Sequence, residues 1–234
     1  MRQAIHIFKK ECMVYFVSPI AYIVISIFLL VTGWFFFTTF FLFNQATLRN
    51  FFALLPVIFS FVVPAITMRL FSEELNVGSY EILLTMPVTF QDIVVGKFLA
   101  STLFVVAMLI PALAYPITVS FLGQLDWGPV MGGYVGAVLL GAAFSAIGLF
   151  ASSLTRNQII AFITGMALCF SLTLIDKMLF FLPQSILGFL QYLGAGFHFN
   201  NISKGIIDSR DILYFLSVIF IGLYGTHLSL AGKN

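Results

Sequence analysis

Residues 51–100 read FFALLPVIFSFVVPAITMRLFSEELNVGSYEILLTMPVTFQDIVVGKFLA, a short polar stretch between two apolar runs. The polar stretch, Met68–Pro87, contains three of the nine carboxylates in the chain and one arginine. Gly78 and Pro87 are expected to interrupt its backbone. Because only 9% of all residues are charged, a loop that gathers charge in this way is expected to meet a soluble partner.

The composition outside this loop is that of an integral membrane protein. Hydrophobic residues make up 61% of the chain, and the mean hydropathy is +1.08. Soluble domains are about 45–50% apolar and about 25% charged. The net charge of +2 is too small to indicate a nucleic-acid partner. Cys12 and Cys169 are predicted to form neither a disulfide framework nor a metal site.

Six apolar runs are long enough to cross a bilayer, which takes about 20 residues as a helix. The runs are continuous and lack two-residue alternation, which predicts helices rather than a barrel. Pro111 and Pro116 predict a kink in the third run, because proline removes a helical hydrogen bond. The predicted spans are Ile20–Phe43, Phe51–Met68, Ile93–Leu122, Pro129–Ser153, Ile159–Ile175 and Ile212–Leu230.

Two further segments flank or interrupt these spans. Residues 1–17 have helical amphipathicity, and Ser18-Pro19 is typical of a helix start. We predict an interfacial helix along the membrane, with a basic cytoplasmic tail as the alternative. The apolar stretches within residues 176–211 are too short to cross the membrane, which predicts a re-entrant or outer segment. The apolar face predicted for the N-terminal helix consists of Ile5, Phe8, Cys12 and Tyr15.

The distribution of basic residues favours a cytoplasmic N-terminus, a cytoplasmic C-terminus and a cytoplasmic loop at 69–91. This orientation places seven basic residues inside and four outside. The inner set is Arg2, Lys9, Lys10, Arg69, Lys97, Arg156 and Lys233, and the outer set is Arg49, Lys177, Lys204 and Arg210.

The sequence lacks the motifs of several kinds of chemistry. Gly96-Lys97-Phe98 has neither the upstream glycine nor the Ser/Thr of a phosphate-binding loop. None of the six runs has an acid or base near its middle, which argues against a proton-coupled carrier or a membrane enzyme. We therefore predict no catalytic residue, no cofactor site and no metal site in this chain. The three histidines, His6, His198 and His227, are expected to be interface residues rather than ligands.

Small residues recur at every fourth position of the fourth span, at Gly133, Ala137, Gly141 and Ser145. Such a stripe allows two helices to approach closely. The partner is either another helix of the same chain or a second copy.

The loop sequence, the six spans and the basic N-terminal helix together resemble the permease subunit of a type-2 ABC exporter. FKKECMVYFVSPIAYIV at 8–24 and AIGLFASSLTRNQIIAF at 146–162 add to the resemblance. Within that family, the chain is most similar to the branch of the gliding-motility permease (the F subunit) and the maturation permease of nitrous oxide reductase systems. The family pattern is matched at Arg69, Glu73, Glu74, Gly78, Ser79, Glu81, Leu83, Leu84, Pro87, Val88, Gly96 and Lys97.

The resemblance implies an all-α permease domain over residues 1–234, with a coupling helix in the cytoplasmic loop and a re-entrant region at 176–211. It implies a bacterial inner-membrane protein that works with a separate ATP-binding cassette ATPase and a second permease subunit, identical or different. ATP and Mg²⁺ would be bound by the ATPase. The implied ATPase-coupling residues are Arg69, Glu73, Glu74, Gly78, Glu81, Leu83, Leu84 and Pro87.

Three functions are compatible with these features. The first is ATP-driven export, and the second is force transmission to a separate periplasmic or accessory membrane protein without transport. The third is an ATP-independent channel or carrier. The loops Asn44–Asn50 and Gln124–Gly128 are short, so any large outer domain would belong to another chain.

Overall fold

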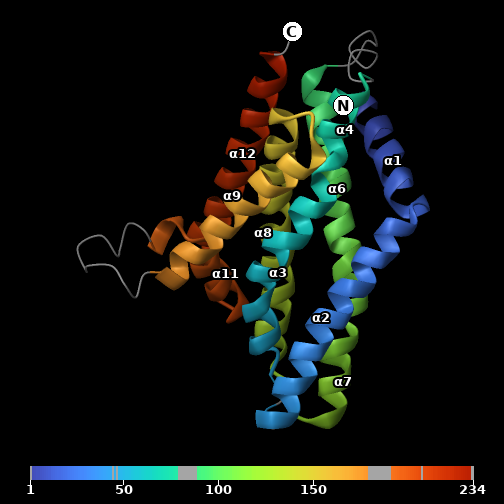
Figure 1. The fold of residues 1–234 in the computed structure, drawn as a ribbon. Helices are drawn as coiled ribbons and strands as arrows, with labels where there is room; N and C mark the ends of the chain where they lie inside the picture. The colour runs from blue at the N-terminus through green and yellow to red at the C-terminus, as the bar shows by residue number, and fades with distance from the viewer. Residues whose placement is uncertain are drawn as a thin grey trace.

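The computed structural model describes residues 2–43, 45, 47–78, 89–178, 191–206 and 208–232, and the regular structure in these ranges is helical. Six stretches within them are long and apolar enough to cross a membrane (Figure 1). The predicted all-α membrane fold is therefore confirmed. The six stretches are Pro19–Leu42, Arg49–Val77, Phe90–Leu122, Trp127–Leu154, Gln158–Lys177 and Ser209–Ala231.

Helix α8 (Trp127–Leu154) is the centre of the bundle. It packs against α3 (Arg49–Thr67), α6 (Phe90–Ala112), α9 (Gln158–Met178) and α12 (Ser209–Ala231), and also contacts α4 and α11. Of its most apolar window, 78% is buried inside the chain. The corresponding share is 22% for the span in α2 (Pro19–Phe43), 22% for α9 and 17% for α12. These three helices therefore form much of the outer wall.

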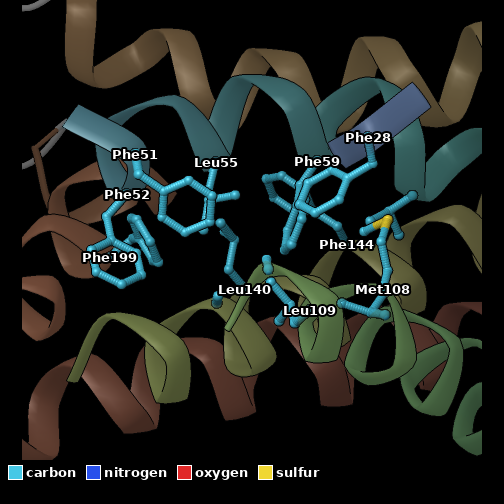
Figure 2. Packing of buried hydrophobic residues seen from close by; sticks show 14 of the residues in the cluster. Phe28, Phe51, Phe52, Leu55, Phe59, Met108, Leu109, Leu140, Phe144 and Phe199 are labelled. Atoms are coloured by element: carbon cyan, nitrogen blue, oxygen red, sulfur yellow. The ribbon is translucent and has the colours of Figure 1, made fainter. Parts of the chain in front are cut away.

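The core between α3 and α8 is built largely from aromatic rings. Figure 2 shows Phe51, Phe52, Leu55 and Phe59 of α3 packed towards Leu140 of α8, with Phe28 of α2 at one side. In a bilayer, packing contacts rather than exclusion of water drive helix association, so close interdigitation of these side chains is the main cohesive interaction.

The small-residue stripe of α8 is filled by the chain's own side chains. A Cβ at Gly133 would collide with the ring of Phe52, and one at Gly141 would lie 2.5 Å from Cγ1 of Val105. Ala137 and Ser145 are completely buried. In this structure the stripe thus lets α3 and α6 approach α8.

The third span is interrupted where its prolines predict. Helix α6 ends at Ala112, and a second helix, α7 (Ala114–Leu122), begins after Leu113. Pro116 has no N–H group to donate to the carbonyl of Ala112. The hydroxyl of Tyr134 in α8 donates to that carbonyl instead, at 2.8 Å. The break is thus stabilised by a side chain of the central helix.

The N-terminal helix α1 (Arg2–Val17) packs along α6 and reaches α2. Gly96 permits this approach, because a Cβ there would lie 2.9 Å from the carbonyl of Ala4. Tyr15 is buried, whereas Ile5 is 52% exposed. The predicted apolar face of α1 stays a prediction, because a face that meets lipid is also exposed within the chain. The position of α1 relative to the membrane surface stays a prediction.

The segment between the last two spans contains α11 (Ala195–Ser203), which packs against α8, α9 and α3. Asp208 is exposed and caps α12 by accepting from the N–H of Arg210 at 3.0 Å. The polar run at 208–211 predicts a wet end of this segment, but Asp211 within it is only 3% exposed. Its Oδ1 lies 2.6 Å from Nδ1 of His198, which explains its inward position. The re-entrant character of residues 176–211 stays a prediction.

Candidate functional site

The candidate site lies at the end of the bundle that carries α4 (Arg69–Val77). The start of α1 and the end of α12 lie at the same end (Figure 1). Helix α4 follows α3 after a single residue, Met68, and ends at Gly78, whose φ of 77° is left-handed. A left-handed residue after the last turn is a common helix terminator, and glycine adopts it without strain. The predicted coupling residues Arg69, Glu73, Glu74 and Gly78 fall here, whereas Glu81, Leu83, Leu84 and Pro87 lie outside the described residues.

A buried lysine connects three helices at this site. Lys97 of α6 is 1% exposed. Its Nζ donates to Oε1 of Glu74 in α4 at 2.8 Å and to Oε1 of Glu11 in α1 at 3.2 Å. The third contact is the carbonyl of Leu70 at 2.7 Å. An ammonium group has three donors, so this lysine is fully satisfied. We call these residues, with Lys10, the lysine cluster.

The lysine cluster balances its own charge. Lys10 Nζ lies 3.6 Å from Oε1 of Glu11 and 3.8 Å from Oε1 of Glu74, and its side chain is 60% exposed. Two lysines thus face two glutamates, which offsets the cost of removing the charges from water. The polar loop sequence predicts short helices with their acids outside, and for Glu74 this prediction is wrong, because Lys97 draws its carboxylate inward. Glu73, the neighbouring acid, is exposed.

Arg69 lies beside α1 rather than in open solution. Its guanidinium carbon is 5.4 Å from the centre of the Tyr15 ring, a cation–π contact. The hydroxyl of Tyr15 donates to the carbonyl of Ile66 at 3.1 Å. Burial raises the pKa of Tyr15, so the phenol stays protonated and keeps this donor. Arg69 and Tyr15 therefore attach α1 to the junction between α3 and α4.

Helix α4 takes its N-terminal cap from another helix. Its N-cap residue, Met68, makes no side-chain capping bond. Instead, Oγ of Ser152 in α8 accepts from the N–H groups of Phe71 and Ser72, both at 3.0 Å. The same hydroxyl donates to the carbonyl of Met68 at 2.7 Å. Sequence reasoning missed this contact, since Ser152 lies 81 residues from Phe71.

A groove of about 310 Å³ opens between α1 and α4. Its polar lining comes from Lys10, Glu11, Arg69, Glu73, Glu74 and Lys97, and Val14 and Val77 add apolar surface. Charges of both signs beside exposed apolar side chains suit a protein surface better than a small apolar ligand.

Residues 5–219 match the family model described as ABC-2 family transporter protein. The match spans most of the chain and includes the described site residues, so this chain belongs to the ABC-2 transporter family. It is a multi-pass membrane permease subunit of an ABC transporter. In this class the ATPase is a distinct ATP-binding cassette protein. A sequence comparison with curated proteins gives no significant match.

Proposed function

We propose that this chain is the permease of an ATP-driven exporter, and that residues 69–91 dock onto a separate ATPase. The observation that carries the proposal is the construction of α4. Its first turn is fixed to α8 by Ser152, and its next turn to α6 and α1 by Lys97. A load applied to α4 therefore reaches the rest of the bundle, because α4 is not free to move alone.

The surface that α4 leaves exposed is suited to docking. Glu73 offers a carboxylate to solution, and Val77 is 74% exposed next to the terminating glycine. An apolar contact with a charged neighbour is typical of a protein interface. The resemblance assigns Glu81, Leu83, Leu84 and Pro87 to the same interface.

The proposed cycle uses the ATPase for chemistry and this chain for movement. The ATPase binds ATP and Mg²⁺, closes as a dimer and moves the two α4 helices of a permease pair. The lysine cluster keeps α1 and α6 attached to α4 during this movement. In the proposed orientation the α4 end and both termini face the cytoplasm of a bacterium, and the six spans cross its inner membrane.

Purification from native cells in mild detergent tests the partner, with mass spectrometry of what is retained. We expect an ABC ATPase to co-purify with the wild-type chain and to be lost on Glu73→Lys and on Glu81→Lys. Gln124→Lys adds a positive charge to an exposed residue outside the docking segment and is expected to retain it. Glu74 is not a suitable site for charge reversal, because its carboxylate holds Lys97. Intact wild-type protein without an ATPase, or full retention by both charge reversals, would overturn the proposal.

A second function, force transmission to an outer protein, is favoured by a groove near the start of α8. This groove, of about 360 Å³, is lined by Gln45, Thr47 and Arg49 on one side and by Gln124, Asp126 and Ser203 on another. Its polar walls suit a protein partner, and the resemblance to motility and enzyme-maturation permeases agrees with one.

ATPase assays on vesicles separate the possible functions. Cargo-stimulated ATPase activity with accumulation in vesicles would support export. ATPase activity that an outer protein changes, without flux, would support force transmission, and flux without any ATPase would support a channel or carrier.

A further inference from the structure

We propose that Ser152 is the positioning residue through which a displacement of α4 is passed to α8. The inference rests on the proposed function, since it takes the ATPase to move α4. It adds the point of transmission, which neither the family match nor the resemblance assigns.

All three hydrogen-bonding positions of the Ser152 hydroxyl are used at the junction between α3 and α4. A hydroxyl has one donor and two acceptor positions. The donor goes to the carbonyl of Met68, and the acceptors receive the N–H groups of Phe71 and Ser72. These are backbone groups, so they move with the axis of α4 itself. A side-chain contact could be lost by a change of rotamer in α4, whereas this contact changes only when the helix moves.

The neighbouring turn of α8 fixes the register of this contact. A Cβ at Gly148, four residues before Ser152, would collide with Oγ1 of Thr67 at the end of α3. Thr67 is itself completely buried and donates to the carbonyl of Val63 at 3.0 Å. Helices α3 and α8 are therefore in close contact one turn from Ser152, which leaves little room for α8 to slide past the junction.

The two attachments of α4 differ in stiffness. Lys97 has a long side chain with four rotatable carbons, and it can follow a rotation of α4 while keeping its bonds. Serine has a single carbon between its backbone and its hydroxyl. A shift of α4 therefore strains the Ser152 contact first, and α8, which packs against α3, α6, α9, α11 and α12, receives it.

The test compares Ser152→Ala with two other variants. Ser152→Thr keeps the hydroxyl. Ser60→Ala is a matched control, because Ser60 is equally buried but its hydroxyl donates only to Val57 of its own helix. The permease–ATPase complex is reconstituted in lipid discs, with Cys12 and Cys169 replaced by alanine. Spin labels at Leu42→Cys and Trp127→Cys report the distance between exposed positions on α2 and α8.

We expect ATP with vanadate to shift this distance in the wild-type background, in Ser152→Thr and in Ser60→Ala. In Ser152→Ala the shift is expected to be lost while the ATPase stays bound and hydrolyses ATP. A distance shift of wild-type size in Ser152→Ala would overturn the inference. Loss of the shift in all three variants would also overturn it, because it would indicate a general disturbance of packing rather than loss of the Ser152 hydroxyl. If Ser152→Ala does not fold, failure of Ser152→Thr to respond overturns it. Absence of an ATP-dependent shift in the wild-type complex would instead refute the proposed function.

Discussion

Replacing Lys97 with methionine tests the lysine cluster directly. Methionine keeps much of the length and apolar volume of the lysine stem but removes the ammonium group. The change leaves Glu11, with 8% of its side chain exposed, and Glu74, with 14%, as two carboxylates facing each other. Lys10 remains nearby, but its side chain is 60% exposed and its bonds are longer.

The expected loss of stability follows from this geometry. Removing one partner of a buried ion pair costs about 3–5 kcal/mol, because an uncompensated charge remains. Lys97 serves two carboxylates and a carbonyl, so we expect the upper part of this range, about 4–5 kcal/mol. That loss lowers the ratio of folded to unfolded protein roughly a thousandfold or more.

Denaturant unfolding in mild detergent, followed by circular dichroism, measures the effect. Lys204→Met is the matched control, because Lys204 is exposed, and we expect its effect to stay within about 0.5 kcal/mol. Adding Glu11→Gln and Glu74→Gln to Lys97→Met removes the unpaired charges and is expected to recover most of the loss. Equal stability of Lys97→Met and Lys204→Met, or no recovery in the triple variant, would refute the reasoning.

Three further predictions concern other contacts. Gly132→Ala places a Cβ against the carbonyl of Ile202 and is expected to cost about 1–3 kcal/mol in the same unfolding assay. Gly128→Ala, which meets only an Asp126 side-chain oxygen at 3.4 Å, should cost less, and equal costs would contradict the packing described. His198→Ala leaves the Asp211 carboxyl buried without its hydrogen-bond partner and should cost about 1–3 kcal/mol, whereas His6→Ala, at an exposed position, should cost little. Burial, with a smaller effect of Glu11, raises the pKa of Cys12. The Cys12 thiol should therefore react with maleimide more slowly than the thiol introduced by Val77→Cys, and its reaction rate should increase as pH rises. Equal rates at neutral pH would contradict this last prediction.

The spans were predictable from sequence because crossing a bilayer imposes a local requirement on length and apolarity. The break at Leu113 was predictable for the same reason, since proline acts on its own turn. The lysine cluster was not predictable in this way. Lys97 is 86 residues from Glu11 and 23 from Glu74, and each residue looks like an ordinary charge near a span end. Only the packing of α1 and α4 on α6 makes them partners.

The direction of single side chains was likewise set by tertiary contacts. Asp208 and Asp211 belong to one polar run in the sequence, which indicated a wet helix end. Asp208 does cap α12, but Asp211 lies within that helix and faces His198 of α11. Composition alone places both residues in water, because the packing of α11 beside Asp211 is not visible in the sequence.

The uneven burial of the six spans has a consequence for how such a protein diversifies. Substitutions in α8 must satisfy many neighbours at once, whereas the described residues bury only 17–22% of the apolar windows of α2, α9 and α12. Changes on these outer helices can alter which subunit, lipid or accessory protein is bound without repacking the interior. The interior can therefore stay nearly constant across related permeases while their associations change. We expect the exposed residues of the outer helices to determine which partners such a permease binds.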